Sequence, residues 1–456
     1  MLLSHLSSAT SVSAMEGGAD EERSVLSQVK KQLSLAVPLV MGCLLQQIIL
    51  TISIMFVEHL GELALASASL ATSFANASGF FLMRIIDPTS IASCCQTGMS
   101  LSLDTLCGKA FGAEQHRLVG VYKQRAMLVL ALDSEIAAHA GSYVRWMIPS
   151  LFLFGQLQCY VRFLQAQNIV VPVMLSSGVT VGIHVAVCWL LGLGVNGAAL
   201  AIVVSYFCNT SYLALYVRLA PSCKKTWTGF SREAFRGIPA FLKLAVPSSM
   251  MLCLEGWAFE LLMLLSGFLS NPKLETAVLS IRFNTYVLAY SVPLGLGFAV
   301  SIRVSNELGA RRPQAARLAT RVVMLLAFSI SFFVALVLVL SRNRLGYLYT
   351  NVEEVALYSS KIMPILASCF SLDSMQCVLA GVVTGCGRQN IGAFINLVAY
   401  YLVGIPAASI FAFVFHLRGK GLWFGIFCGV AVQMLLLLSI TLCTNWNKQV
   451  SIPLKL

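Results

Sequence analysis

The stretch FLQAQNIVVPVMLSSGVTVGIHVAVCWLLGLGVNGAALAIVVSYFCNTSYLALYV, residues 163–217, decides the fold class of this chain. It contains no Asp, Glu, Lys or Arg over its whole length. A helix needs only about 20 apolar residues to cross the hydrocarbon core of a bilayer, and a helix in a soluble core has no use for so long an uncharged run. The stretch therefore predicts membrane-spanning helices.

Further uncharged runs, each close to one membrane crossing in length, recur along the chain. They cover residues 32–57, 63–83, 283–302, 322–341, 389–417 and 421–447. Of the 456 residues, 58% are hydrophobic and 11% are charged, whereas a soluble protein has about 25% charged residues. We therefore expect an all-α polytopic membrane protein. This composition excludes a soluble enzyme, a nucleic-acid binder and a secreted disulfide scaffold.

The net charge of +12 comes from basic residues that gather in short connections between the apolar runs. They cluster at 109–125, 218–243 and 303–321, whereas the connection at 191–197 carries no charge. Because loops rich in Lys and Arg stay in the cytosol, we expect the loops at 109–125 and 218–243 to be cytosolic. The charge orients the chain in the lipid bilayer and does not indicate a nucleic-acid partner.

The fourteen cysteines lie mostly within the predicted spans and show no metal-ligand spacing. We expect them to pack as small apolar residues, so the sequence predicts neither a metal site nor a cofactor. Residues 1–31 are polar, of mixed charge and without an apolar signal core. They are expected to form a disordered cytosolic tail.

Short motifs of the first half return in the same order in the second half. LSLAVP at 33–38 matches LKLAVP at 242–247, and FGA at 111–113 matches LGA at 308–310. Such internal repeats, arranged around a site near the membrane midplane, are common in secondary transporters. The repeats predict two homologous six-helix lobes, a basic cytosolic linker between them and a short cytosolic tail. The boundaries are 32–217 and 244–443 for the lobes, 218–243 for the linker and 444–456 for the tail.

The spacing of the repeated motifs reveals two irregularities in the first half. Residues 84–97 are an insertion that interrupts the second span with Arg84 and Asp87-Pro88, and we predict a break in the helix between residues 83 and 98. Residues 126–139 contain a deletion, because only 126–132 are apolar before Asp133. The third helix is therefore expected to be truncated.

Three carboxylates lie inside predicted spans, where charged groups are rare. Glu255 and Glu260 belong to one span and Asp373 to another. A carboxylate near the bilayer midplane costs a few kcal/mol, so it needs a proton, a partner or water. Proton coupling at Glu255 and Asp373 is the first interpretation, and a structural ion pair with Arg282 is the second. Tyr290 and Trp257 could stack on a flat or cationic substrate, although packing in the core explains such residues equally well.

Several long motifs resemble the plant-type branch of the multidrug and toxic compound extrusion (MATE) family. They include FVEHLGELAL at 56–65, RWMIPS at 145–150, PSCKKTWTGF at 221–230, RVSNELGA at 303–310 and KGLW at 420–423. The resemblance covers roughly residues 30–447. It implies a twelve-helix, two-lobe monomer in the vacuolar or plasma membrane that exchanges cytosolic organic compounds, often cationic or phenolic, for protons.

The resemblance also implies the position of the proton site. The family's Cys-Leu-Glu stretch corresponds to Cys253-Leu-Glu255, and its Leu-Asp-x-x-Gln-Cys stretch corresponds to Leu372-Asp-Ser-Met-Gln-Cys377. Arg282 replaces a small or neutral residue just before Asn284, near the expected site. These residues predict a proton-coupled antiporter for organic cations, xenobiotics or secondary metabolites. The alternative is a non-transporting isoform or a flippase-like membrane protein of the same architecture.

Overall fold

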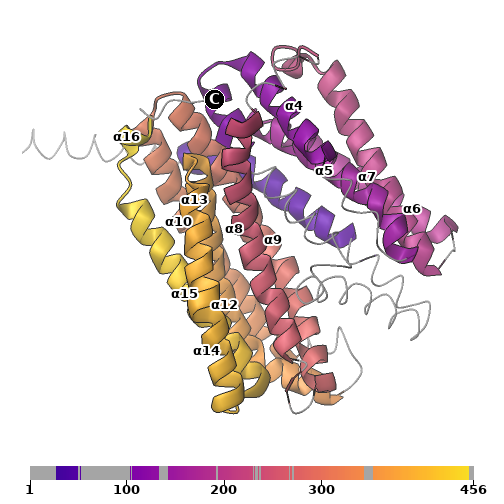
Figure 1. Ribbon diagram of the computed structural model, residues 1–456, viewed down its shortest axis with the longest axis vertical. Helices are drawn as coiled ribbons and strands as arrows, with labels where there is room; N and C mark the ends of the chain where they lie inside the picture. The colour runs from indigo at the N-terminus through magenta and orange to yellow at the C-terminus, as the bar shows by residue number, and fades with distance from the viewer. Residues whose placement is uncertain are drawn as a thin grey trace, which may run out of the picture.

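The protein is a bundle of long helices in the computed structural model (Figure 1). The structure describes residues 27–49, 105–132, 142–191, 194–229, 238–266, 272–343 and 353–450, together with a few isolated positions. Every secondary-structure element in these ranges is a helix. The expected all-α fold class is therefore confirmed.

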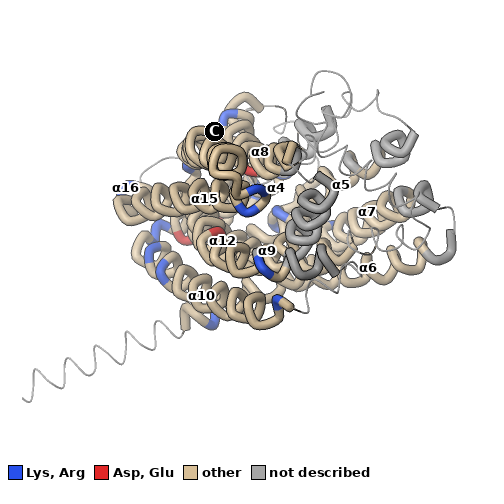
Figure 2. The backbone as a smooth tube through the Cα atoms, turned by 90° about the horizontal axis from the view of Figure 1, so that it is seen from below, with Lys and Arg blue, Asp and Glu red and all other residues tan. Residues whose placement is uncertain are grey.

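Most of the described helices are suited to a bilayer. Within the described ranges, nine helices are long and apolar enough to cross a membrane. They are Ser27–Ile49, Val171–Cys188, Leu200–Leu219, Ile238–Phe259, Tyr286–Gly309, Pro313–Leu340, Met363–Cys386, Gln389–Val414 and Arg418–Leu442. Charged residues are sparse along these helices (Figure 2). The chain is a multi-pass integral membrane protein.

The helices of the first half pack mainly on one another. After Ser27–Ile49 and a helix at 105–112, they are α4 (His116–Leu132), α5 (Ser142–Ala166), α6 (Val171–Leu191) and α7 (Gly194–Leu219). Helix α7 packs against both α5 and α6, while α4 packs against α5. Fully buried aromatic and aliphatic side chains from these helices, among them Phe163, Leu164 and Leu213, form one continuous core.

The second half is built around α12. Its helices are α8 (Ile238–Ser266), α9 (Pro272–Gly309), α10 (Pro313–Leu340), α12 (Glu353–Cys386), α13 (Gln389–Asn396), α14 (Ile405–Ser409), α15 (Arg418–Leu442) and α16 (Trp446–Val450). Helix α12 contacts α9, α10 and α15. Pro247, Pro293 and Pro364 lie inside α8, α9 and α12, where a proline removes a backbone hydrogen bond from the helix.

The two halves meet closely at one end of the bundle. A side chain at Gly112 would collide with the backbone of Asn306, and one at Gly309 would collide with the backbone of Lys109. Only a residue without a Cβ allows two helix backbones to approach this closely. The Nζ of Lys109 also donates a hydrogen bond to the carbonyl oxygen of Cys386 at 3.1 Å. The positive-inside rule assigns this end, next to residues 311–321, to the cytosol.

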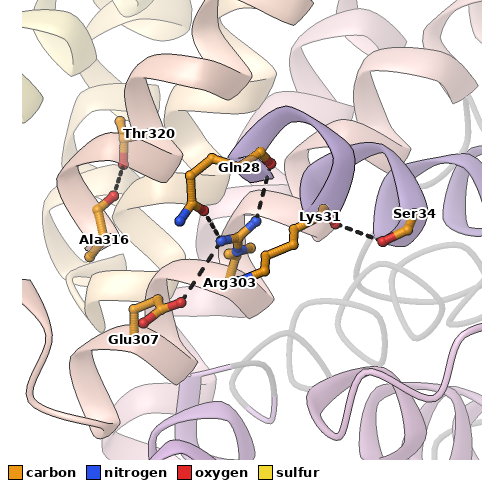
Figure 3. Close-up of polar contacts among 7 residues, drawn as sticks. All are labelled: Gln28, Lys31, Ser34, Arg303, Glu307, Ala316 and Thr320. Carbon is orange, nitrogen blue, oxygen red and sulfur yellow. Dashed lines mark hydrogen bonds and ion pairs between the residues drawn. The ribbon is translucent and has the colours of Figure 1, made fainter. Parts of the chain in front are cut away.

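The first helix adds a polar contact at the same end (Figure 3). Arg303 of α9 donates hydrogen bonds to the side chain and to the backbone carbonyl of Gln28, and it forms an ion pair with Glu307 at 3.9 Å. The contact joins the N-terminal helix to the second half of the chain. In this conformation the cytosolic end of the bundle is therefore tied together by both glycine packing and polar contacts.

The expected loop at 109–125 is wrong in this structure, because these residues are mostly helical. The helix at 105–112 ends in a tight turn with Glu114 at a positive φ of 60°, and α4 begins at His116. Residues 126–132 form the end of α4, which has 17 residues. This is slightly shorter than the roughly 20 residues of a typical membrane crossing. The insertion at 84–97, the predicted break at 83–98 and residues 133–141 lie outside the described residues.

Candidate functional site

Two carboxyl groups lie together inside the second half. Glu255 comes from the middle of α8, and Asp373 comes from the middle of α12, where its side chain is 1% exposed. The Nε2 of Gln376 donates to Asp373 Oδ1 at 2.7 Å and to Glu255 Oε1 at 3.3 Å. One amide group, one turn beyond Asp373 on the same helix, therefore bridges both carboxyl groups.

The hydrogen bonds that the described residues give to this pair come from neutral donors. Besides Gln376, the hydroxyl of Tyr290 on α9 donates to Glu255 Oε1 at 3.5 Å. Neutral donors stabilise a charged carboxylate less than an Arg or Lys partner does. Two neighbouring carboxylates in a low-dielectric interior also repel each other. The arrangement is consequently suited to holding a proton and giving it up again.

Aromatic rings form one wall of this site. Tyr286 stacks on Tyr290 with 5.7 Å between the ring centroids, and it meets Phe370 edge-on at 6.3 Å. Trp423 of α15 lies against the ring of Tyr286, with 6.4 Å between the ring centroids. The rings exclude bulk water from one side of the pair, and this strengthens the electrostatic interactions within the site.

A central cavity lies between the two halves of the chain and has a volume of about 230 Å³. The first helix, α5, α6 and α7 contribute most of its wall, and α9 closes the other side. The polar part of the wall consists mainly of amides and hydroxyls, namely Gln46, Gln47, Gln158, Gln165, Asn209, Ser177, Ser291, Tyr206 and Tyr290. Tyr290 thus touches both the cavity and Glu255, so it connects the two sites.

Arg162 is the charged residue among the described lining residues of the cavity. Its side chain is 2% exposed, and its Nη1 donates to Gln165 Oε1 at 3.2 Å. The guanidinium lies 3.8 Å from the ring centroid of Phe298 on α9, which is a cation–π contact across the two halves. The residue lies one turn before the end of α5, toward the cytosolic end of the bundle.

The structure brings some of the predicted site residues together and places others elsewhere. It brings Glu255 and Asp373 into one hydrogen-bonded group and places Tyr290 beside them. Trp257 is half-buried on α8, and it is not among the described residues that line the cavity. The candidates Glu260, Arg282 and Asn284 lie on α8 and α9, and their side chains lie outside the described part of the structure.

Sequence reasoning misses two residues of these sites. Gln376 lies within a family motif that assigns it no role, although its position three residues after Asp373 places both on one helix face. Arg162 directly precedes the uncharged stretch 163–217, where it looks like the boundary of a span. A charged side chain within one turn of a helix end can still point into the bundle. The position of Arg162 at the edge of an uncharged stretch is the signal in the sequence that could have indicated this.

Comparisons with known proteins agree with this architecture. The model of the MatE family matches residues 38–134 and 247–410. Protein DETOXIFICATION 16 of Arabidopsis thaliana is 50% identical, over 94% of this chain and 91% of that protein, and Protein DETOXIFICATION 17 is 47% identical over 93% and 92%.

Solved structures show the same likeness in three dimensions. The crystal structure of the eukaryotic MATE transporter AtDTX14 superposes with a TM-score of 0.86 and 38% identity, over 93% of this chain and 98% of that one. A mutant of the Vibrio cholerae MATE transporter VcmN shares the fold with a TM-score of 0.77 and 16% identity, over 93% of this chain and all of that one. The chain belongs to the multidrug and toxic compound extrusion family of membrane transporters, and it is not an enzyme.

Proposed function

We propose that this transporter exports small organic compounds from the cytosol in exchange for protons, and that Glu255 and Asp373 together carry the proton. The observation that supports this most directly is the carboxyl pair bridged by Gln376 in the middle of two membrane helices. Burying a carboxylate in a membrane is unfavourable in free energy, and such residues typically belong to ion or proton pathways.

Tyr290 offers a physical link between the proton and the substrate. Its hydroxyl contacts Glu255, and its side chain also lines the central cavity. When Glu255 is ionised it accepts this hydrogen bond strongly, and when it is protonated the bond weakens. Because α9 carries Tyr290 and also forms the cytosolic contact with the first half, a change at Glu255 acts on a helix that both lobes share. Proton loading and cavity opening are coupled through this helix.

The test uses purified full-length protein in liposomes with an acidic interior. Uptake is followed with the cationic dye ethidium and, separately, with the anionic dye 7-hydroxycoumarin-3-carboxylate. Wild-type protein is expected to accumulate at least one of these dyes only while the pH gradient is present. The variants Glu255→Gln and Asp373→Asn are expected to lose the accumulation.

Glu114→Gln provides the matched control, because it also removes one carboxylate but from an exposed turn. It should transport as the wild type does. Transport by the wild type that ignores the pH gradient, or an unchanged rate in Glu255→Gln, contradicts proton coupling. Gradient-independent movement of lipid instead of dye would favour the flippase-like alternative.

A further inference from the structure

We propose that Tyr400 is a positioning residue of the proton site, and that its hydroxyl donates a hydrogen bond to Glu255 and Asp373 only when these carboxyl groups are ionised. The inference rests on the proposed function, because it assigns a further residue to the carboxyl pair that carries the proton. It is drawn from the level of Tyr400 along the helices, from its burial and from the missing partner of its hydroxyl.

Tyr400 lies at the level of Glu255 on a neighbouring helix. Helices α13 and α8 pack against each other (Figure 1), and the Nδ2 of Asn396 donates to the backbone carbonyl of Met251 at 2.7 Å. Further along both helices, the ring centroid of Tyr400 lies 6.3 Å from that of Phe259. The two helices therefore run in the same direction. Because residues four apart share one helix face, Met251, Glu255 and Phe259 all face this neighbour.

The helix that carries Tyr400 is shaped so that this residue faces inward. Its turns at Leu397–Gly404 and Ile410–Val414 are π-helical, a form that occurs frequently at functional sites. In a regular α-helix, positions spaced by four would drift around the axis by about 160° over sixteen residues. The wider π-helical turns offset this drift, so buried positions recur at a spacing of four, at 396, 400, 404, 408 and 412. Tyr400 belongs to this buried face.

Two contacts with α15 hold the segment on either side of Tyr400. A Cβ at Gly425 would lie 2.2 Å from the Cα of Ala408, so the two backbones touch there. On the other side, the Nε2 of Gln433 donates to Asn396 Oδ1 at 2.8 Å. The backbone around Tyr400 is therefore fixed, and the ring stays in the core of the second half.

The hydroxyl of Tyr400 is a buried donor without a partner in this conformation. The side chain is fully buried, and its Oη has no hydrogen-bond partner among the described residues. An unpaired polar group in the interior is unfavourable in free energy. Glu255 and Asp373 are its foremost electrostatic neighbours. The hydroxyl is therefore next to the two groups whose charge changes when a proton is released.

The carboxyl pair gains free acceptor sites when it is ionised. Two carboxylates together offer about eight acceptor sites, whereas a protonated carboxyl group is itself a donor. In this conformation the pair accepts hydrogen bonds from Gln376 and Tyr290, and Gln433 lies within reach of Glu255. Ionisation thus creates acceptors beside a hydroxyl that has none. A hydrogen bond to the charged form of a carboxyl group favours that form.

The other titratable groups around Tyr400 are cysteines and one tyrosine. Among the described residues they are Cys369 and Cys377 of α12, Tyr290 of α9, and Cys428 of α15, which lies beside Cys369. Cysteine and tyrosine have ordinary pKa values of about 8.5 and 10. Between pH 5 and pH 8, the carboxyl pair is therefore the group in this set whose charge controls the hydroxyl.

The first experiment follows ionisation of the pair without any substrate. Infrared difference spectra of full-length protein in detergent report protonated carboxyl groups, and the band that Asp373→Asn removes identifies the pair. In Tyr400→Phe the carboxyls lose a donor to their charged form, so they hold their proton more tightly. We expect the midpoint of this band to move to a higher pH by about one unit, which is a tenfold change in proton affinity.

Tyr401→Phe is the matched control. It removes the same hydroxyl from the next residue, which is half-buried and has Cys253 instead of the carboxyl pair as its electrostatic neighbour. Its midpoint should equal that of the wild type. Uptake of ethidium into proteoliposomes, measured over a pH series with a constant difference between inside and outside, should show the same shift in Tyr400→Phe and none in Tyr401→Phe.

Thermal unfolding separates this role from simple packing. At pH 5 the hydroxyl has no partner, so Tyr400→Phe should keep the Tm of the wild type, whereas at pH 8 its Tm should be lower. A Tyr400→Phe variant that is already destabilised or unfolded at pH 5 would show that the hydroxyl has a partner there, and this would overturn the proposal.

Two further results would also overturn it. One is an infrared midpoint that is the same in Tyr400→Phe and in the wild type. The other is an equal shift in Tyr401→Phe, which would mean that the carboxyls respond to any change in this helix. A wild type whose uptake ignores the pH gradient would refute the proposed function instead, and the infrared shift in Tyr400→Phe would remain as evidence for the contact.

Discussion

Apart from Arg303 at the cytosolic contact, the two halves of this chain bury charges of opposite sign. The first half buries Lys123 and Arg162, whereas the second half buries Asp373 beside Glu255. The cations are stabilised by aromatic rings, and the acids are stabilised by an amide and a phenol. Two halves with repeated sequence motifs therefore differ in the chemistry of their buried charges. On the function proposed above, the second half carries the proton.

The largest effect is expected at Asp373. Asp373→Asn keeps the shape of the side chain but removes its titratable carboxyl group, so accumulation driven by the pH gradient should fall to the level of protein-free vesicles. The double variant with Glu255→Gln should be no worse than either single variant, because groups that act as a unit are not additive. Initial rates of uptake in proteoliposomes check this. If Asp373→Asn keeps part of the uptake and the double variant loses the rest, the two carboxyls act independently.

The second-largest effect is expected at the glycine contact between the two halves. Gly112→Leu places a side chain against the backbone of Asn306, and overpacking of a rigid backbone contact costs about 3 kcal/mol or more. The closed cytosolic end should loosen, with a lower Tm in detergent and faster labelling of a cysteine placed nearby. Gly182→Leu is the control, because a Cβ at Gly182 meets no atom within 4 Å. Equal Tm losses in both variants would show that the contact is not specific.

A smaller effect is expected at the bridge between the carboxyls. Gln376→Leu removes the donor that both carboxyl groups share, which costs about 1–3 kcal/mol for groups left without a partner. The loss grows when the carboxyls are charged, so the Tm of the variant should fall further below wild type at pH 8 than at pH 5. Thermal unfolding at the two pH values checks the sign. An equal loss at both pH values would mean that the bridge does not sense ionisation.

The smallest effect is expected at Lys123. Within the described residues its Nζ has no hydrogen-bond acceptor, and it lies over the rings of Tyr160, Trp227 and Phe163 at 3.6, 4.1 and 4.7 Å. The cation–π gain offsets much of the cost of burying the charge, so Lys123→Met should change the stability by less than about 1 kcal/mol. A loss of several kcal/mol on thermal unfolding would reveal a missing acidic partner.

The fold class and the acidic site could be predicted from the sequence, because each depends on a local signal. Uncharged runs of membrane length predict helices, and a carboxylate inside such a run is conspicuous. Residues 109–125, which were expected to form a loop, are mostly helical, and their basic residues are not all solvent-exposed. Lys123 instead turns inward onto Trp227 of the linker, and Gln124 holds the same linker through Gly229 at 2.7 Å. A buried cation inside an aromatic cage leaves no mark in a hydropathy pattern.

The cavity could not be predicted, because its wall depends on which helices become neighbours. Arg162 and Phe298 are far apart in the sequence, and their contact exists only once α5 and α9 cross. Asn209 looks like one polar residue in an apolar run, although its missing partner is a property of three-dimensional packing. Gln376 escapes prediction for the same reason, since its bridging role needs Glu255 from another helix.

The close contact between residues 109–112 and 306–309 has an evolutionary consequence. Each glycine faces the residue three positions before the other glycine, and the two segments are the FGA and LGA copies of one repeated motif. The same short peptide therefore meets its own duplicate, as in the interface of a symmetric dimer. In an ancestor made of two identical subunits, a single glycine substitution would have produced both halves of this contact at once. In a single chain each copy varies alone, so both glycines have to be kept separately for the contact to persist.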